Sequence, residues 1–352
     1  MSLKVGIDVT PVLNKIPRGI GSYIFELTTH MLDVEYKYLY KISRLKYPNR
    51  LRRLWSRGWP FFEIGEKAIF PVKFQIFHGT DAYLPKNGKI GKILTIHDVY
   101  PIIDSPEGRA AAKIRRALKR EPDALILISE FAKKEFLRYF PGFEDKIFVI
   151  YHGVSDFWKV LKSKECDFIY KKFGIERRFY FYAGDSEKRK NLDNLLIAFS
   201  HLKENVQLVI AGGFLKESHR KLIEKQGIRD RVIEVGYVTR KELRCFYNLA
   251  IAFVFVSLYE GFGLPLLEAM RCGVPVVASD IEVFRELADG GFVKVDPFSP
   301  LNIAEGLRLV LDPQKRRTLV ELGLQIASRF TWSKTATETR KVYNLVVNYV
   351  KA

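Results

Sequence analysis

Short apolar runs alternate with amphipathic segments along the chain, which is the pattern of an α/β protein. In the first part, apolar runs bounded by polar or glycine-containing segments predict buried strands. These runs are residues 4–9, 74–77, 93–96, 124–128 and 147–150. A helix is expected from Ser22 onward, after a loop through Gly19 and Gly21. Because strands and helices take turns, the pattern predicts a parallel sheet.

A second series of strands follows a polar stretch. Thr239 and Glu242 have the spacing of a helix capping box. The strands are expected at residues 179–183, 206–211, 232–235, 252–257 and 274–278. The pattern therefore predicts two α/β domains joined by a charged linker and followed by a last helix. The expected boundaries are 1–154 for the first domain, 155–178 for the linker, 179–330 for the second domain and 331–352 for the helix.

Composition agrees with two domains and narrows the class of protein. A chain of 352 residues with 47% hydrophobic content can fill two cores. No apolar run reaches the roughly 18 residues that a membrane span needs, and the chain starts directly in a strand pattern without a signal peptide. Cys166, Cys245 and Cys272 have neither metal-ligand nor disulfide spacing, so a reducing cytoplasm is the expected compartment.

The formal charge of +18 requires an anionic partner or a tolerance of self-repulsion. No nucleic-acid-binding signature focuses the charge, so nucleic acid ranks below a membrane surface or a nucleotide sugar. Residues 36–62 interleave basic and aromatic side chains without an acid. An interfacial helix on anionic lipid and a solvated basic face fit this segment equally well. Binding to the inner face of the plasma membrane is thus one expectation.

Glu260 and Glu268 flank a glycine-rich turn that opens a helix. Pro265 favours a helix start, and Gly273 ends the helix. Glycines let a ligand approach the backbone amides at a helix start, where the helix dipole favours a phosphate. The two carboxylates can accept hydrogen bonds from hydroxyl groups. A ribose and a hexose on either side of a diphosphate present that pattern.

The stretch from Tyr247 to Val277 resembles the retaining glycosyltransferases of family 4, which have the GT-B fold. Their signature is Glu, seven residues, Glu, and the match includes the flanking strand and the segment Gly273 to Val277. Val256 departs from the family, which usually has proline there. The resemblance implies two Rossmann-like domains that face a cleft, with the C-terminal helix crossing back to the first domain.

The resemblance also implies roles for individual residues. Glu268 is expected to hold the ribose and Glu260 the donor sugar. The family clamps the donor diphosphate with a basic pair after the first strand of the second domain, which here is Arg189 and Lys190, and fixed cations stabilise charge on a leaving phosphate. His97 is expected to contact the sugar. The remaining expected donor-binding residues are Gly184, Gly261, Phe262, Gly263, Leu264, Gly19 and Gly21.

The implied function is a retaining, metal-independent hexosyltransferase of surface-polysaccharide assembly with a saccharide or lipid-linked acceptor. GDP-mannose is the first expectation for the donor and a UDP-hexose the second; no cofactor and no metal site are expected. Two alternatives stay open: a sugar-nucleotide epimerase of the same fold, and a non-catalytic subunit that binds nucleotide sugars. The presence of both acids and the basic pair argues against the subunit.

Overall fold

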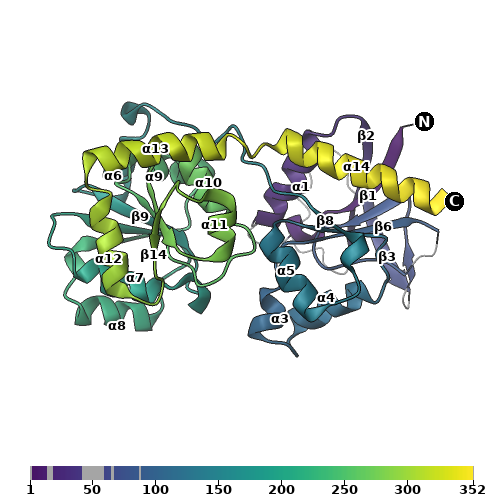
Figure 1. Ribbon diagram of the computed structural model, residues 1–352, viewed down its shortest axis with the longest axis horizontal. Helices are drawn as coiled ribbons and strands as arrows, with labels where there is room; N and C mark the ends of the chain where they lie inside the picture. Colours follow the sequence, from purple (N-terminus) through teal and green to yellow (C-terminus); the bar gives the residue numbers. More distant parts are fainter. Residues whose placement is uncertain (1, 14–18, 42–58, 65–66, 87–88, 352) are drawn as a thin grey trace. The chain divides into compact units, whose positions relative to one another are not determined.

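A computed structural model describes residues 2–13, 19–41, 59–64, 67–86 and 89–351. The chain forms two compact units, each with its own sheet (Figure 1). The first unit contains Met1–Gly153 together with Thr331–Ala352, and the second contains Val154–Phe330. The expected linker residues 155–178 belong to the second unit and contain the short helix α6 (Phe168–Phe173), which ends at Gly174 in a left-handed conformation.

Within the described residues, the first unit has an eight-stranded sheet in the order β4-β3-β2-β1-β5-β6-β7-β8. All neighbouring strands are parallel except β3 and β4. The strands are β1 (Leu3–Asp8), β2 (Val34–Lys41), β3 (Trp59–Ile64), β4 (Lys67–Ile69), β5 (Ile76–Gly79), β6 (Gly91–Ile96), β7 (Ala124–Leu127) and β8 (Ile147–Val149). The strand order reverses between β1 and β5.

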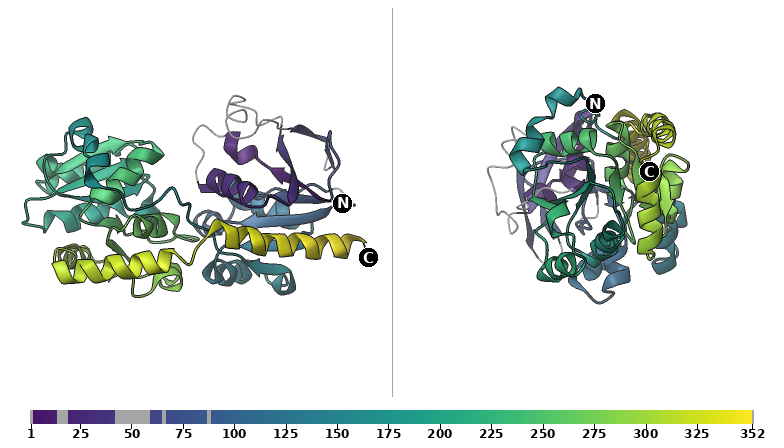
Figure 2. Two further views of the ribbon diagram at one scale, coloured as in Figure 1. Left: turned by 90° about the horizontal axis from the view of Figure 1, so that it is seen from above. Right: turned by 90° about the vertical axis from the view of Figure 1, so that its left-hand side faces the viewer.

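Among the described residues of the first unit, four α-helices lie between the strands, and the last helix of the chain packs with them. They are α1 (Gly19–Thr29), α3 (Tyr100–Asp104), α4 (Arg109–Leu118) and α5 (Glu130–Tyr139). Helix α14 (Trp332–Lys351) contacts α1, β5 and β6 (Figure 2, left). A side chain on Gly91 would place its Cβ 2.5 Å from Val346, so the start of β6 needs glycine for this close packing.

Within the described residues, the second unit has a six-stranded parallel sheet in the order β11-β10-β9-β12-β13-β14. The strands are β9 (Phe179–Gly184), β10 (Gln207–Gly212), β11 (Val232–Gly236), β12 (Phe253–Phe255), β13 (Val276–Ser279) and β14 (Val293–Val295). This is the doubly wound order. Successive strands are added on one side of the first strand, β9, and from the fourth strand, β12, onward they are added on its other side. The reversal point lies between β9 and β12, and such points hold ligands at the carboxyl ends of the strands.

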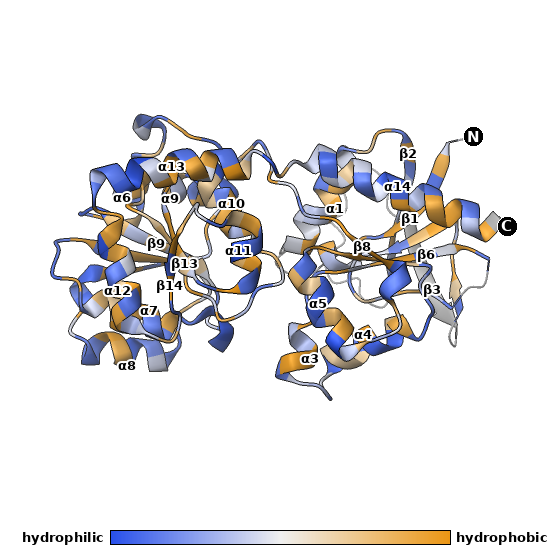
Figure 3. Cartoon of the chain, viewed as in Figure 1, coloured by the Kyte–Doolittle hydropathy of each residue, from blue (hydrophilic) through white to orange (hydrophobic). Residues whose placement is uncertain are grey.

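Helices cover both faces of the second sheet in two contacting groups. One group is α7 (Leu192–Ser200), α8 (Glu217–Lys225) and α12 (Pro300–Leu309). The other is α6, α9 (Arg240–Leu249), α10 (Leu264–Arg271), α11 (Glu282–Ala288) and α13 (Pro313–Ala327). The strands are mostly apolar and the helices carry polar residues beside apolar ones (Figure 3). This pattern is expected of strands buried on both faces and of helices with one face in water.

The predicted strands are present, with ends shifted by a few residues, and Thr239 forms the expected capping box with Glu242. Strands β2, β3, β4 and β14 were missed. Part of the basic aromatic segment 36–62 is therefore sheet: Tyr36, Tyr38 and Tyr40 alternate along β2 and pack against the core of the first unit. Residues 42–58, which make up most of this segment, lie outside the described residues.

The expectation that the cysteines are unpaired was wrong for two of them. Cys166 and Cys245 form a disulfide across 79 residues of sequence, because α9 packs against α6 and brings the two Cα atoms to 5.1 Å. Cys272 is free and buried. In the part of the chain that the structure describes, no helix has both the length and the apolar character needed to cross a membrane.

Candidate functional site

The loop after β9 carries the predicted basic pair at the reversal point of the second sheet. Arg189 and Lys190 lie in a single 3₁₀ turn, Lys188–Lys190, which Asn191 ends in a left-handed conformation. The turn is fixed to the chain that follows β12, because the N–H of Leu258 donates to the carbonyl of Arg189 at 2.7 Å. The basic pair is thus held at the carboxyl edge where doubly wound sheets bind ligands.

Hydrogen bonds of the Asn191 and Tyr182 side chains hold this loop in place. The side-chain amide of Asn191 donates to the carbonyls of Val256, at 2.9 Å, and Pro297, at 2.7 Å, while the hydroxyl of Tyr182 donates to the carbonyl of Lys190 at 3.2 Å. Both side chains are buried. Since buried hydrogen bonds are costly to break, the positions of Arg189 and Lys190 are set by the fold rather than by solvent.

Glu260 contacts both members of the basic pair. Its Oε1 accepts from Lys190 Nζ at 2.5 Å, and its Oε2 lies 3.4 Å from Arg189 Nη1. The three side chains are between 12% and 19% exposed, so water screens their charges only partly. Arg189 also donates to Glu187 at 2.8 Å. The cluster therefore holds two cations and two acids, and an arriving diphosphate would compete with the carboxylates.

The start of α10 lies directly after Glu260. Gly263 has φ = +126° and precedes the helix, and a Cβ on it would lie 3.0 Å from the Phe284 ring. Only glycine fits this conformation without strain. The first backbone N–H groups of a helix have no acceptor within the helix and attract anions. Leu264 is the first residue of α10, while Gly261 and Phe262 form the buried turn before it.

Glu268 is on α10, partly exposed, beside α9. Burial raises the pKa of Cys272 to about 12, and the charge of Glu268 adds to this effect. Burial also raises the pKa of the Tyr247 hydroxyl, and the charge of Glu268 is the second cause of this shift. The Glu268 carboxylate is therefore close to both Tyr247 and Cys272. It could accept hydrogen bonds from the hydroxyl groups of a ligand.

Gly184 ends β9 at the same edge of the sheet. A Cβ at this position would lie 2.7 Å from the Tyr182 hydroxyl, and the backbone of Gly184 is itself close to Gly212. The two glycines keep the ends of β9 and β10 free of side chains. The structure thus brings Gly184, Arg189, Lys190 and Glu260 to one edge of the second sheet, with the start of α10 next in the chain after Glu260.

His97 lies in the first unit, at the end of β6, and both of its ring nitrogens contact protein atoms. Nε2 is 3.1 Å from the carbonyl of Thr80, and Nδ1 is 3.3 Å from Nε2 of His152. Burial lowers the pKa of His97 to about 4, so the ring is neutral at pH 7. Because a carbonyl only accepts, Nε2 carries the proton and Nδ1 accepts from His152. A proton-transfer role for His97 would require these contacts to break.

A buried polar network lies next to His97, whose ring contacts the ring of Tyr23. His78 contacts the Thr95 hydroxyl at 2.7 Å with Nε2 and the Tyr343 hydroxyl at 2.7 Å with Nδ1. Tyr23 reaches the same Thr95 hydroxyl at 3.0 Å. The network joins α1, β5, β6 and α14 through polar contacts inside the core. His152 stacks on Trp332, the first residue of α14.

The loop predicted to contain Gly19 and Gly21 is partly helix. Helix α1 begins at Gly19, so both glycines lie in its first turn rather than before it. A Cβ on Gly19 would meet no atom within 4 Å, so packing among the described residues does not require glycine there. The sequence predicted a helix from Ser22 onward, but α1 starts three residues earlier, at Gly19.

Among the described residues, no group of three or more His, Cys, Asp or Glu side chains is arranged to hold a metal ion. The sequence did not single out Asn191 or Tyr182, which position the basic pair. Asn191 directly follows Lys190 and precedes an apolar helix. An asparagine at such a boundary is a recognisable signal, because this residue type tolerates the left-handed conformation.

Two family models match the chain. The model described as "Glycosyltransferase Family 4" matches residues 18–156, and the model described as "Glycosyl transferases group 1" matches residues 167–323. The chain is 31% identical over 294 residues to O-antigen chain mannosyltransferase B of Escherichia coli, covering 79% of this chain and 76% of that protein. It is 28% identical to the serotype-specific mannosyltransferase WbdA of Escherichia coli over 80% of this chain, but spans only 37% of WbdA.

Solved structures show the same fold. HepE of Anabaena, crystallised with UDP and glucose, superposes with a TM-score of 0.79 and 17% identity, covering 97% of this chain and 99% of HepE. WaaG, a glycosyltransferase of lipopolysaccharide biosynthesis, superposes with a TM-score of 0.70 and 14% identity over 97% of this chain and 99% of WaaG. The two-sheet architecture is therefore that of known glycosyltransferases.

Proposed function

The chain belongs to glycosyltransferase family 4, and from this premise we propose that it transfers a hexose from a nucleotide diphosphate sugar to a saccharide or lipid-linked acceptor, with retention of configuration. Mannose is the favoured hexose and GDP-mannose the favoured donor, because the two curated relatives described above are named as mannosyltransferases. A UDP-hexose is the second candidate, supported by the UDP bound to HepE. The proposed setting is the assembly of a surface polysaccharide.

One observation carries the proposal: Lys190 and Arg189 meet Glu260 at the reversal point of the second sheet. In the proposed complex, the two cations bind the diphosphate while Glu260 turns toward the hexose. Glu268 accepts hydrogen bonds from the ribose. Gly184 and the turn Gly261 to Leu264 allow the donor to approach the backbone. We also assign His97, Gly19 and Gly21 to the sugar end of the donor as part of the same proposal.

In the proposed reaction, the bond between the anomeric carbon and the diphosphate oxygen breaks as the acceptor oxygen bonds to the same face of the sugar. The acceptor proton passes to the departing phosphate oxygen, so atoms and charge balance. Negative charge that develops on the leaving group is stabilised by Arg189 and Lys190. Because two fixed cations can provide this stabilisation, we propose that no metal is needed.

The test is donor turnover by the full chain. Purified protein is incubated with GDP-mannose, UDP-glucose or UDP-galactose, with and without EDTA, and released nucleotide is measured. We expect slow release from one donor, preferentially GDP-mannose, unchanged by EDTA. A new sugar nucleotide without release would instead indicate an epimerase. Loss of activity in EDTA would contradict metal independence, and no release from any donor would contradict transferase activity toward these donors.

We also propose that the chain works at an anionic membrane surface. The charge of +18 and the basic residues within 36–62 support this proposal. Vesicles with and without phosphatidylglycerol provide the test at moderate salt. Equal co-sedimentation with the two kinds of vesicle would contradict the membrane proposal and leave the transferase proposal intact.

A further inference from the structure

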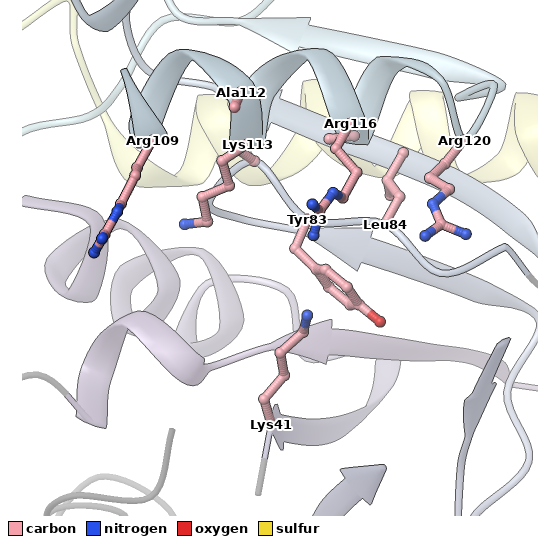
Figure 4. A pocket seen from close by; sticks show the side chains of 10 residues that line it. Lys41, Tyr83, Leu84, Arg109, Ala112, Lys113, Arg116 and Arg120 are labelled. Carbon is pink, nitrogen blue, oxygen red and sulfur yellow. The ribbon is translucent and has the colours of Figure 1, made fainter. Parts of the chain in front are cut away.

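A cavity on the first unit, of about 370 Å³, is lined largely by cations (Figure 4). It lies between α4 on one side and the ends of β2 and β5 on the other. We call it the basic cavity. Its charged and aromatic lining residues are Lys41, Tyr83, Arg109, Lys113, Arg116 and Arg120. The volume is within the range of roughly 300–1,000 Å³ that small-molecule sites occupy.

The spacing of the cations along α4 explains why they share one wall. Arg109, Lys113 and Arg116 are separated by four and three residues, and Arg120 follows four residues later, just after the helix ends. Residues at these intervals lie on one face of a helix. The opposite face of α4 is buried and apolar, with Ala111, Ile114 and Leu118 in the core. Figure 4 shows Arg116 reaching toward Tyr83, with Arg120 on one side of it, whereas Arg109 and Lys113 extend away from Tyr83 at the other end of this wall.

The facing wall is held by an unusual piece of backbone. Lys41 ends β2, and its ammonium group lies 3.4 Å from the centre of the Tyr83 ring, a cation–π contact. Ala82 has φ = +44°, a conformation that non-glycine residues rarely adopt. A Cβ on Gly79 would lie 2.0 Å from the Tyr83 carbonyl oxygen. The position of Tyr83 in the cavity thus depends on a strained backbone at Ala82 and on the absence of a side chain at Gly79.

The charge in the basic cavity is not balanced by the described residues that line it. Lys113 pairs with Asp81 at 2.6 Å. Among the described residues, neither Arg109 nor Arg116 forms an ion pair or hydrogen bond. Like charges that share one face of a helix repel one another, and a bound anion would relieve that repulsion. Arginine binds phosphate through two parallel hydrogen bonds, which favours a phosphate-bearing ligand over a simple counter-ion.

We propose that the basic cavity binds a phosphate or diphosphate group carried by the acceptor. The inference rests on the proposed function, since it requires an acceptor, and it assigns that acceptor a chemical class. The group can belong to a water-soluble phosphorylated saccharide or to a lipid-linked one, because both present the same oxygens. Arg109 and Arg116 bind the phosphate oxygens, and Lys41 and Arg120 contribute positive charge from the two walls.

The direct test uses inorganic pyrophosphate as the probe. Titration calorimetry is done on the full chain carrying Lys190→Gln, so that the proposed donor site contributes little binding. We expect binding that weakens about tenfold in Arg116→Gln and further when Arg109→Gln is added, because each change removes charge-assisted hydrogen bonds. The matched control is Lys119→Gln, which removes one exposed charge next to Arg120 outside the cavity. It should bind pyrophosphate as its parent does.

Farnesyl diphosphate in detergent micelles separates the two sources of the group. Tighter binding than that of pyrophosphate, with the same dependence on Arg116, indicates a lipid-linked acceptor; equal binding indicates recognition of the phosphate alone. Both results support the proposal. Equal pyrophosphate affinity in Arg116→Gln, Lys119→Gln and their parent would overturn it.

Donor hydrolysis keeps the two proposals apart. Lys119→Gln in the wild-type background should release nucleotide from the donor at the wild-type rate, because Lys119 lies outside both proposed sites. If Arg116→Gln loses pyrophosphate binding while donor hydrolysis is absent from wild type, the proposed function fails and the anion site stands. If the wild type hydrolyses the donor and Arg116→Gln binds pyrophosphate as tightly as its parent, the anion site fails and the proposed function stands.

Discussion

Lys190 donates a hydrogen bond to Glu260 across 70 residues of sequence, with Nζ and Oε1 2.5 Å apart. The contact links the loop after β9 to the loop after β12, which are the two loops of the reversal point. A cation and an acid are thus held together at the carboxyl edge of the second sheet. This arrangement is the basis of the assignments above.

The first prediction concerns Lys190. Replacement by alanine removes a fixed cation from the proposed diphosphate site, and donor hydrolysis should fall by roughly a hundredfold. Lys188→Ala is the matched control, because Lys188 belongs to the same 3₁₀ turn but is exposed. Its rate should stay near that of wild type. Equal losses in the two variants would mean that general charge, rather than the placement of Lys190, matters.

Gly263 provides a test of the turn before α10. Gly263→Ala combines a positive φ with a close approach to the Phe284 ring. We expect a loss of about 2 kcal/mol and a drop in the thermal midpoint of roughly 4–8 °C. Gly227→Ala shares the positive φ but would meet no atom within 4 Å, and should cost about half as much. A Gly263→Ala protein as stable as Gly227→Ala would contradict the predicted clash.

The buried histidines predict a loss of stability in mild acid. Burial lowers the pKa of His78 to about 3 and of His97 to about 4, and that of His152 well below its usual value. Between pH 6.5 and 4 the unfolded chain binds protons that the folded chain does not, so unfolding becomes easier as pH falls. Burial raises the pKa of Asp8 to about 6, which has the opposite sign and offsets part of the loss near pH 5.

Urea unfolding of the full chain at pH 7.5, 6.0 and 5.0 measures this effect. Each unbalanced proton contributes up to about 1.4 kcal/mol per pH unit. The free energy of unfolding should fall over this range, and less steeply in His78→Asn, which has one titrating ring fewer. Stability that is flat, or that rises toward pH 5, would show that the three rings are not held neutral.

The disulfide between Cys166 and Cys245 predicts sensitivity to reductant. It closes a loop of 79 residues, for which loop-closure entropy gives about 4.5 kcal/mol. Dithiothreitol should lower the thermal midpoint of the wild type and leave a Cys166→Ser/Cys245→Ser variant unchanged. If the wild type is equally stable with and without reductant, the bond does not form in solution or does not contribute to stability.

The local pattern was sufficient for strands whose side chains are uniformly apolar. Residues 124–128 and 179–183 are such cases, because strands buried on both faces read as continuous hydrophobic runs. Strand β2 was missed for the opposite reason. Lysines alternate there with tyrosines, so the segment has the composition of a basic surface. Its period of two nevertheless packs Tyr36, Tyr38 and Tyr40 on the core. Strand β2 pairs with β1 in parallel, and no local signal identifies that pairing.

The site was predictable to the level of residue types and loops. Arg189, Lys190 and Glu260 were each expected at the carboxyl ends of strands, but their mutual contact depends on β9 and β12 being neighbours, which is a property of the sheet order. The engagement of His97 by Thr80 and His152 was not predictable, because three separate segments create it. The same holds for Cys166 and Cys245, which only the packing of α6 on α9 brings together.

The most direct test of the central claim is nucleotide binding to the second unit within the full chain. GDP and UDP are titrated by calorimetry into the wild type, Glu268→Ala and the control Glu321→Ala, whose carboxylate is exposed on α13. The account predicts preferential binding of one nucleotide, about tenfold weaker in Glu268→Ala and unchanged in Glu321→Ala. Absence of binding by either nucleotide, or equal affinity in all three proteins, would contradict the assignment of this edge of the sheet as the donor site.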